Sequence, residues 1–142
     1  MFRLRRRVKI LIGGIEAGGT KIICGVGEVK DGKIRILSEM RFPTTTAAQV
    51  LPEIINWFRQ YSIEALGIAS FGPLDLKKDS PTYGYIKATP KKGWQDVDFV
   101  GPFARSLSVP IEFDTDVNGA ALGESVYGAG MGCPVVSYMT VG

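Results

Sequence analysis

Histidine is absent from this sequence of 142 residues, and its absence excludes several kinds of active site. His is the most frequent general base in enzymes and a ligand in most catalytic zinc sites. A Ser-His-Asp triad is excluded for the same reason. Any general base in this chain must therefore be another kind of side chain.

Cysteine and long apolar runs are also scarce. Cys24 and Cys133 are the only two cysteines, which is too few for a disulfide framework, and their spacing does not fit a metal site. No apolar run approaches the roughly 20 residues of a membrane span. We expect a cytoplasmic protein with no membrane partner.

A broad excess of positive charge is missing as well. The formal net charge is +3, but Arg3, Arg5, Arg6, Arg7 and Lys9 supply five positive charges, so the remainder carries a net charge of −2. This pattern predicts a solvated basic flank at residues 1–12 and no general surface for nucleic acid. A signal peptide is disfavoured because the following apolar run is short and Glu16 interrupts it.

The first half of the chain predicts three strands and a helix. Strands are expected at residues 9–15, 22–29 and 34–40, and Asp31-Gly32 is typical of a type I′ turn between the second and the third. After a break at residues 43–46, apolar residues at helical spacing predict a helix to about residue 61, with Pro52 in or near its first turn.

The second half predicts alternating strands and helices. We expect a buried strand at residues 65–71, a helix at 98–107 capped by Asp98, a strand from Ile111, a buried helix at 117–126 and a last strand at 134–141. The connection over residues 74–98 shows no period and is long enough to be functional. The predicted order is βββαβαβαβ, a three-stranded antiparallel meander extended by parallel strands.

Asp116 and Asn118 lie at a predicted strand-to-helix corner. Open α/β sheets bind ligands at this edge, where a carboxylate can accept a proton from a hydroxyl and an amide can hold the same substrate. Alternatively, Asp114, Thr115 and Asp116 serve as helix caps. This stretch alone leaves both interpretations open.

A glycine turn follows the first predicted strand. The run from Gly14 to Lys21 approaches a P-loop, but Thr20 and Lys21 stand in the wrong order and a strand follows in place of a helix. Two glycines can still bring backbone N–H groups close to an anion, and Thr20 and Lys21 add a hydroxyl and a cation. An ordinary hairpin without a ligand is the alternative.

Four motifs in order identify a resemblance. They are Glu16-Ala-Gly-Gly-Thr-Lys21, Phe71-Gly-Pro-Leu-Asp75, Thr89-Pro-Lys-Lys-Gly-Trp94 and Asp114-Thr-Asp-Val-Asn118. From about Gly14 onward the chain resembles the N-terminal half of the ROK sugar kinases, most closely their fructokinase branch. The resemblance implies the α/β fold of the ribonuclease-H-like (actin-like ATPase) class. It also implies that residues 13–142 form an N-terminal domain and that the chain is cut before a C-terminal nucleotide-binding domain.

The resemblance also implies roles for single residues. Asp116 would be the general base, and Glu16 would lie near Mg²⁺, directly or through water. The phosphates of ATP would be held by Gly18, Gly19, Thr20, Lys21 and Gly142. The sugar would be bound by Gly72, Pro73, Thr89, Pro90, Lys91 and Asn118. A structural Zn²⁺ is expected only in the C-terminal half, and Trp94 is expected to fix its loop by packing.

The implied activity is that of an ATP-dependent hexose kinase that forms fructose 6-phosphate from fructose. The complete protein would be a homodimer, and the 142-residue chain alone would be inactive. The alternatives are a kinase for another hexose such as glucose or for an acylamino-sugar, a sugar-sensing regulator, and a domain that binds a partner without chemistry. Regulators carry a helix-turn-helix ahead of the kinase fold, and only about a dozen residues precede the first motif here.

Overall fold

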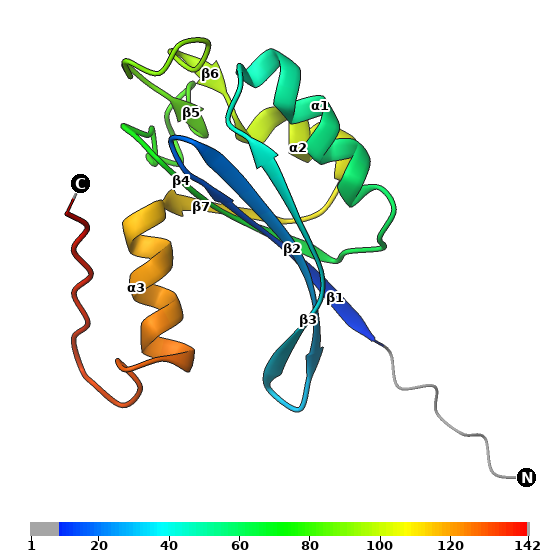
Figure 1. The fold of residues 1–142 in the computed structure, drawn as a ribbon, viewed down its shortest axis with the longest axis vertical. Helices are drawn as coiled ribbons and strands as arrows, with labels where there is room; N and C mark the ends of the chain where they lie inside the picture. The colour runs from blue at the N-terminus through cyan, green and yellow to red at the C-terminus, as the bar shows by residue number, and fades with distance from the viewer. Residues whose placement is uncertain (1–8, 142) are drawn as a thin grey trace, which may run out of the picture.

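A five-stranded sheet organises residues 9–141, the part of the chain that the computed structural model describes (Figure 1). In spatial order its strands are β3 (Lys33–Pro43), β2 (Lys21–Lys30), β1 (Ile10–Ala17), β4 (Ala65–Ser70) and β7 (Ile111–Thr115). The pairs β3–β2 and β2–β1 are antiparallel, whereas β1–β4 and β4–β7 are parallel. The predicted meander with added parallel strands is confirmed.

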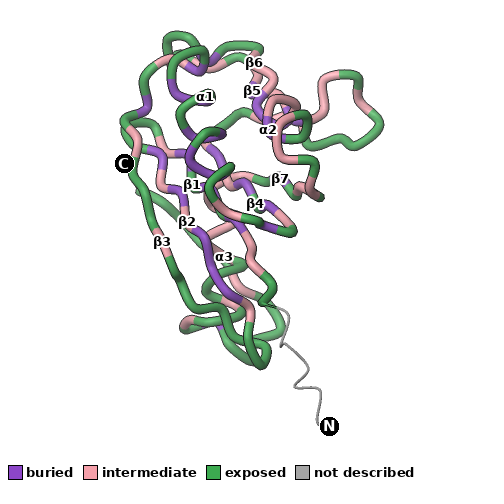
Figure 2. Tube along the Cα trace, turned by 90° about the vertical axis from the view of Figure 1, so that its right-hand side faces the viewer, coloured by how far each residue is buried: buried purple, intermediate pink, exposed green. Residues whose placement is uncertain are grey.

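In the described part of the chain, three helices cover the two faces of the sheet. Helices α1 (Ala47–Phe58) and α2 (Val100–Leu107) lie on one face, and α3 (Asp116–Tyr127) lies on the other (Figure 1). Buried segments concentrate in the central strands and under α1, while the edge strand β3 is exposed along nearly its whole length (Figure 2). The sheet is therefore better covered on the side of α1 and α2.

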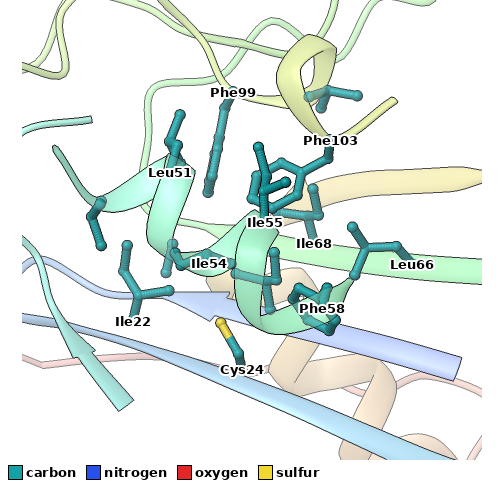
Figure 3. Packing of buried hydrophobic residues seen from close by; sticks show 14 of the residues in the cluster. Ile22, Cys24, Leu51, Ile54, Ile55, Phe58, Leu66, Ile68, Phe99 and Phe103 are labelled. Atoms are coloured by element: carbon teal, nitrogen blue, oxygen red, sulfur yellow. The ribbon is translucent and has the colours of Figure 1, made fainter. Parts of the chain in front are cut away.

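Helix α1 supplies much of the core because its apolar residues recur at helical spacing. Ile54 and Phe58 are buried against the sheet (Figure 3), and Val50 on the same helix is buried as well. Burying one such side chain stabilises the fold by about 1.5–3 kcal/mol. The predicted helix is confirmed, but it begins at Ala47, so Pro52 lies beyond the first turn, contrary to expectation.

Cys24 lies in this core, and burial raises the pKa of its thiol to about 12 (Figure 3). Cys133 is exposed. Because the thiolate is the reactive species, we expect a thiol reagent such as Ellman's to modify Cys133 in the native protein and Cys24 only after denaturation. In a Cys133→Ser variant the fast native reaction should disappear. Equal reaction rates at both cysteines would contradict this assignment.

Helix α3 is not the buried helix that its small residues predict. None of its residues is buried, and Leu122 is 65% exposed. It approaches the sheet through Gly119, where an added Cβ would lie 2.6 Å from the Cβ of Ala69. The Ala and Gly content therefore permits a close approach to β4 over a small area and does not bury the helix.

The predicted last strand is also wrong. Residues 134–141 have no regular secondary structure, and Val135, Met139 and Val141 are 79%, 85% and 93% exposed. Apolar β-formers make a ladder only where a neighbouring strand is available to pair with them. The predicted order is further corrected by β5 (Tyr85–Ile86) and β6 (Val97–Asp98), a short hairpin inside the long connection.

Residues 1–8 of the predicted basic flank and Gly142 lie outside the described residues, and residues 10–12 of that flank belong to β1. Within residues 9–141, no helix combines the length and hydropathy that crossing a bilayer requires.

Candidate active site

The glycine turn connects β1 to β2 and is anchored to the segment that follows β3. The Gly18 N–H donates to the Lys21 carbonyl at 2.9 Å. Thr44 donates twice, from its hydroxyl to the Gly18 carbonyl at 2.8 Å and from its N–H to the Thr20 carbonyl at 3.0 Å. These bonds within the chain fix the conformation of the turn.

The Gly-Trp loop, residues 89–94, lies against the same turn. The Lys91 ammonium donates to the Gly19 carbonyl. The Trp94 indole N–H donates to the Thr45 carbonyl at 2.6 Å, and its ring is fully buried, edge-on to Phe71 with 5.4 Å between centroids. Trp94 therefore fixes the loop by packing, as predicted.

The Gly-Pro loop, residues 71–75, joins the other two. The Phe71 N–H donates to the Ala17 carbonyl at the end of β1, at 2.9 Å. The Lys87 N–H donates to the Pro73 carbonyl at 2.8 Å, which ties this loop to the segment just before the Gly-Trp loop. The Gly72–Pro73 peptide bond is cis.

Asp75 stabilises the conformation of this region. Its carboxylate accepts hydrogen bonds from the hydroxyls of Ser80 and Thr82, both at 2.6 Å, and from the Lys77 N–H at 3.1 Å. These bonds, led by the Ser80 hydroxyl, lower the pKa of Asp75 below its usual value, since they favour the ionised form. Asp75 is thus engaged with its own loop.

Three side chains accept hydrogen bonds at the corner between β7 and α3, and one of them caps the helix. The Thr115 hydroxyl accepts the Asn118 N–H at 3.2 Å and is the N-cap. Asp114 Oδ1 accepts from the Asn118 side-chain amide at 2.8 Å. Asp116 Oδ1 accepts the Val117 N–H at 2.9 Å, whereas Oδ2 has no hydrogen-bond partner within residues 9–141. One oxygen of Asp116 is therefore free to accept a further hydrogen bond.

These four segments meet at one edge of the sheet. Ala17 pairs with Ser70 and Ser70 pairs with Thr115, so β1, β4 and β7 end at the same level. At 4.7–4.9 Å per strand, β1 and β7 are about 10 Å apart. The glycine turn, the Gly-Pro loop and the corner leave this edge together, and Lys91 and Trp94 attach the Gly-Trp loop to it. The alternative of a domain that binds a partner without chemistry predicted that these segments would lie far apart.

A hollow of about 650 Å³ lies on the α3 side of the sheet. Glu16 and Asp114 line it, whereas Asp116, Gly72 and Thr89 do not. Within residues 9–141, no three Asp, Glu, Cys or His side chains are placed so that they could hold a metal ion together. Mg²⁺ usually binds proteins through one or two carboxylates and completes its shell with substrate phosphates and water. The single carboxylate of Glu16 is therefore sufficient to hold Mg²⁺ beside a phosphate. The described residues do not fit a zinc site.

Residues 12–142 match the family model described as the ROK family. The chain belongs to the ROK family. It is 44% identical over 140 residues to a fructokinase of Zymomonas mobilis (94% of this chain, 46% of the relative). It is 41% identical over 133 residues to a fructokinase of Pediococcus pentosaceus (94% and 45%). The chain thus spans less than half the length of these relatives.

Among solved structures, the chain is similar to a ROK family glucokinase from Streptomyces griseus in complex with glucose and AMPPNP. The TM-score is 0.68 at 30% identity, over 86% of this chain and 38% of that one. The match to the ROK family includes all four motifs of the site.

The structure adds details to the sequence-based set of residues. Lys21 is exposed, and Gly142 lies outside the described residues. Lys91, assigned to the sugar, contacts the glycine turn. Thr44 and Thr45, which anchor the turn and Trp94, were not predicted, although a run of three threonines after a strand could have signalled an anchoring segment.

Proposed function

We propose that this chain is the N-terminal part of an ATP-dependent hexose kinase that phosphorylates fructose to fructose 6-phosphate. The fructokinases that share 41% and 44% of its residues support this substrate. The observation that carries the proposal is the common edge of the sheet from which the glycine turn and Asp116 leave. A kinase needs hydrogen-bond donors that hold the phosphate and, close to them, a group that accepts the proton of the attacking hydroxyl.

The proposed chemistry uses few groups. The free oxygen of Asp116 accepts the proton of the attacking sugar hydroxyl, and the glycine turn with Lys21 holds the transferred phosphate. Asn118 and the loops at Gly72-Pro73 and Thr89-Pro90 orient the sugar. Mg²⁺ bound near Glu16 would neutralise part of the negative charge of the phosphates. Positioning and charge stabilisation account for most of the catalysis of phosphoryl transfer.

The rest of the complete protein is part of the proposal. Residues 13–142 form its N-terminal domain, and a second domain provides the nucleotide pocket and the structural zinc site. Gly142 begins a further phosphate-binding segment. The complete protein is a homodimer, and its use of ATP fits the cytoplasm.

An assay of ADP release tests the proposal. The full-length protein is given Mg-ATP with fructose, glucose, mannose or N-acetylmannosamine, and EDTA serves as the control. We expect the highest kcat/KM with fructose. A preference for glucose would favour the second candidate, a glucokinase, in line with the named activity of the Streptomyces griseus structure. Failure to phosphorylate any sugar, together with sugar-sensitive DNA binding, would favour the regulator.

A further inference from the structure

The carbonyl groups of Gly18, Gly19 and Thr20 in the glycine turn all accept hydrogen bonds from residues outside the turn. The Thr44 hydroxyl binds the Gly18 oxygen at 2.8 Å, and the Lys91 ammonium binds the Gly19 oxygen. The N–H groups of Gly19 and Thr20 have no hydrogen-bond partner within residues 9–141. In this turn the carbonyl oxygens accept hydrogen bonds, whereas two successive N–H groups donate none within the described residues.

This division follows from the geometry of the peptide unit. In a planar trans peptide, the C=O of one residue and the N–H of the next point in opposite directions. Holding the Gly18 oxygen therefore directs the Gly19 N–H away from Thr44. Holding the Gly19 oxygen directs the Thr20 N–H away from Lys91 in the same manner. Successive backbone N–H groups in a turn can form an anion-binding concavity.

We propose that Thr44 and Lys91 are positioning residues that orient these two amides toward a phosphate group of ATP. The inference rests on the proposed kinase function, which supplies the phosphate. It moves Lys91 from the sugar site to the phosphate site, because its ammonium is already engaged by the Gly19 carbonyl. Since Lys91 and Gly19 are 72 residues apart in sequence, this bond also joins the Gly-Trp loop to the phosphate turn.

Lys92 provides a matched control. It carries the same charge as its neighbour, and its side chain is exposed and makes no hydrogen bond or ion pair within residues 9–141. If the two lysines only supplied positive charge near a phosphate, removing either would have a similar effect. If Lys91 orients the turn, its replacement alone changes the use of ATP.

Steady-state kinetics of the full-length protein, with ATP and fructose varied separately, tests the inference. We expect Lys91→Met to raise KM for ATP by about tenfold or more, the loss of one charge-assisted hydrogen bond, and to leave KM for fructose within about twofold. Lys91→Arg should restore part of the loss, and Lys92→Met should match the wild type. Thr44→Val should act in the same direction as Lys91→Met, and Thr44→Ser should not.

A second readout follows the amides themselves. With ¹⁵N labelling, the Gly19 and Thr20 resonances should shift on addition of Mg-AMP-PNP in the wild type and in Lys92→Met, and much less in Lys91→Met. An unchanged melting temperature shows that each variant is folded.

Two results overturn the inference alone. They are a Lys91→Met enzyme whose KM rises for fructose in place of ATP, and an active Lys91→Met enzyme indistinguishable from Lys92→Met. A wild-type protein that phosphorylates no hexose overturns the proposed function first, and the inference with it.

Discussion

Replacing Asp116 by asparagine is expected to lower kcat by about 10²–10⁴-fold, the usual contribution of a positioned general base. Asparagine keeps a side-chain oxygen that can accept the Val117 N–H, so the start of α3 is preserved. The variant loses only the ability to take a proton from the sugar. The affinity for fructose, measured by calorimetry, should therefore change little.

Glu112→Gln is the control for this variant. Glu112 lies four residues earlier on β7, and its exposed carboxylate is paired with Lys78 at 3.3 Å. Removing this charge should leave kcat within about twofold, since surface ion pairs contribute little. Near-wild-type turnover of Asp116→Asn would remove Asp116 from the role of base. Equal losses in both variants would point to a general charge effect.

Trp94→Ala is expected to destabilise the fold by about 3–5 kcal/mol, the range for removal of a large buried aromatic side chain. The ring is fully buried between Phe71 and Phe99, and its N–H satisfies the Thr45 carbonyl. Trp94→Phe keeps most of the ring contact but leaves that carbonyl unpaired, which costs about 1–3 kcal/mol. Urea unfolding followed by circular dichroism measures both free energies.

Trp57→Phe is the matched control for the hydrogen bond. Trp57 is also buried, at 7% exposure, but its indole N–H makes no hydrogen bond within residues 9–141. We expect Trp57→Phe to lower the free energy of unfolding less than Trp94→Phe does. Equal losses would show that the bond to Thr45 contributes nothing measurable. Because Trp94 supports the loop that carries Lys91, Trp94→Ala should also raise KM for ATP.

The parts of the fold that sequence patterns predicted are those with a period. Alternating and continuous apolar runs identified the five strands of the main sheet, and helical spacing identified α1. The two-residue strands β5 and β6 are too short to show a period. Residues 134–141 resemble a strand in composition, but pairing depends on a neighbour that composition does not reveal.

The grouping of the candidate site was predictable where its residues share a motif. Asp116, Asn118 and the glycine turn stand in short, ordered motifs, and the structure places the strands that carry them at one edge. Thr44 and Thr45 were missed because their function depends on partners distant in sequence. The Thr44 hydroxyl meets Gly18 from 26 residues away, and the Thr45 carbonyl meets Trp94 from 49 residues away.

The turn between β2 and β3 has a practical use because of where it lies. Asp31 and Gly32 have φ values of 52° and 73°, as a type I′ turn requires. Strand β2 leads to them over ten residues, so the turn is about 33 Å from the glycine turn. An affinity tag inserted there would attach the protein to a surface with the edge that carries the candidate site turned toward the solution.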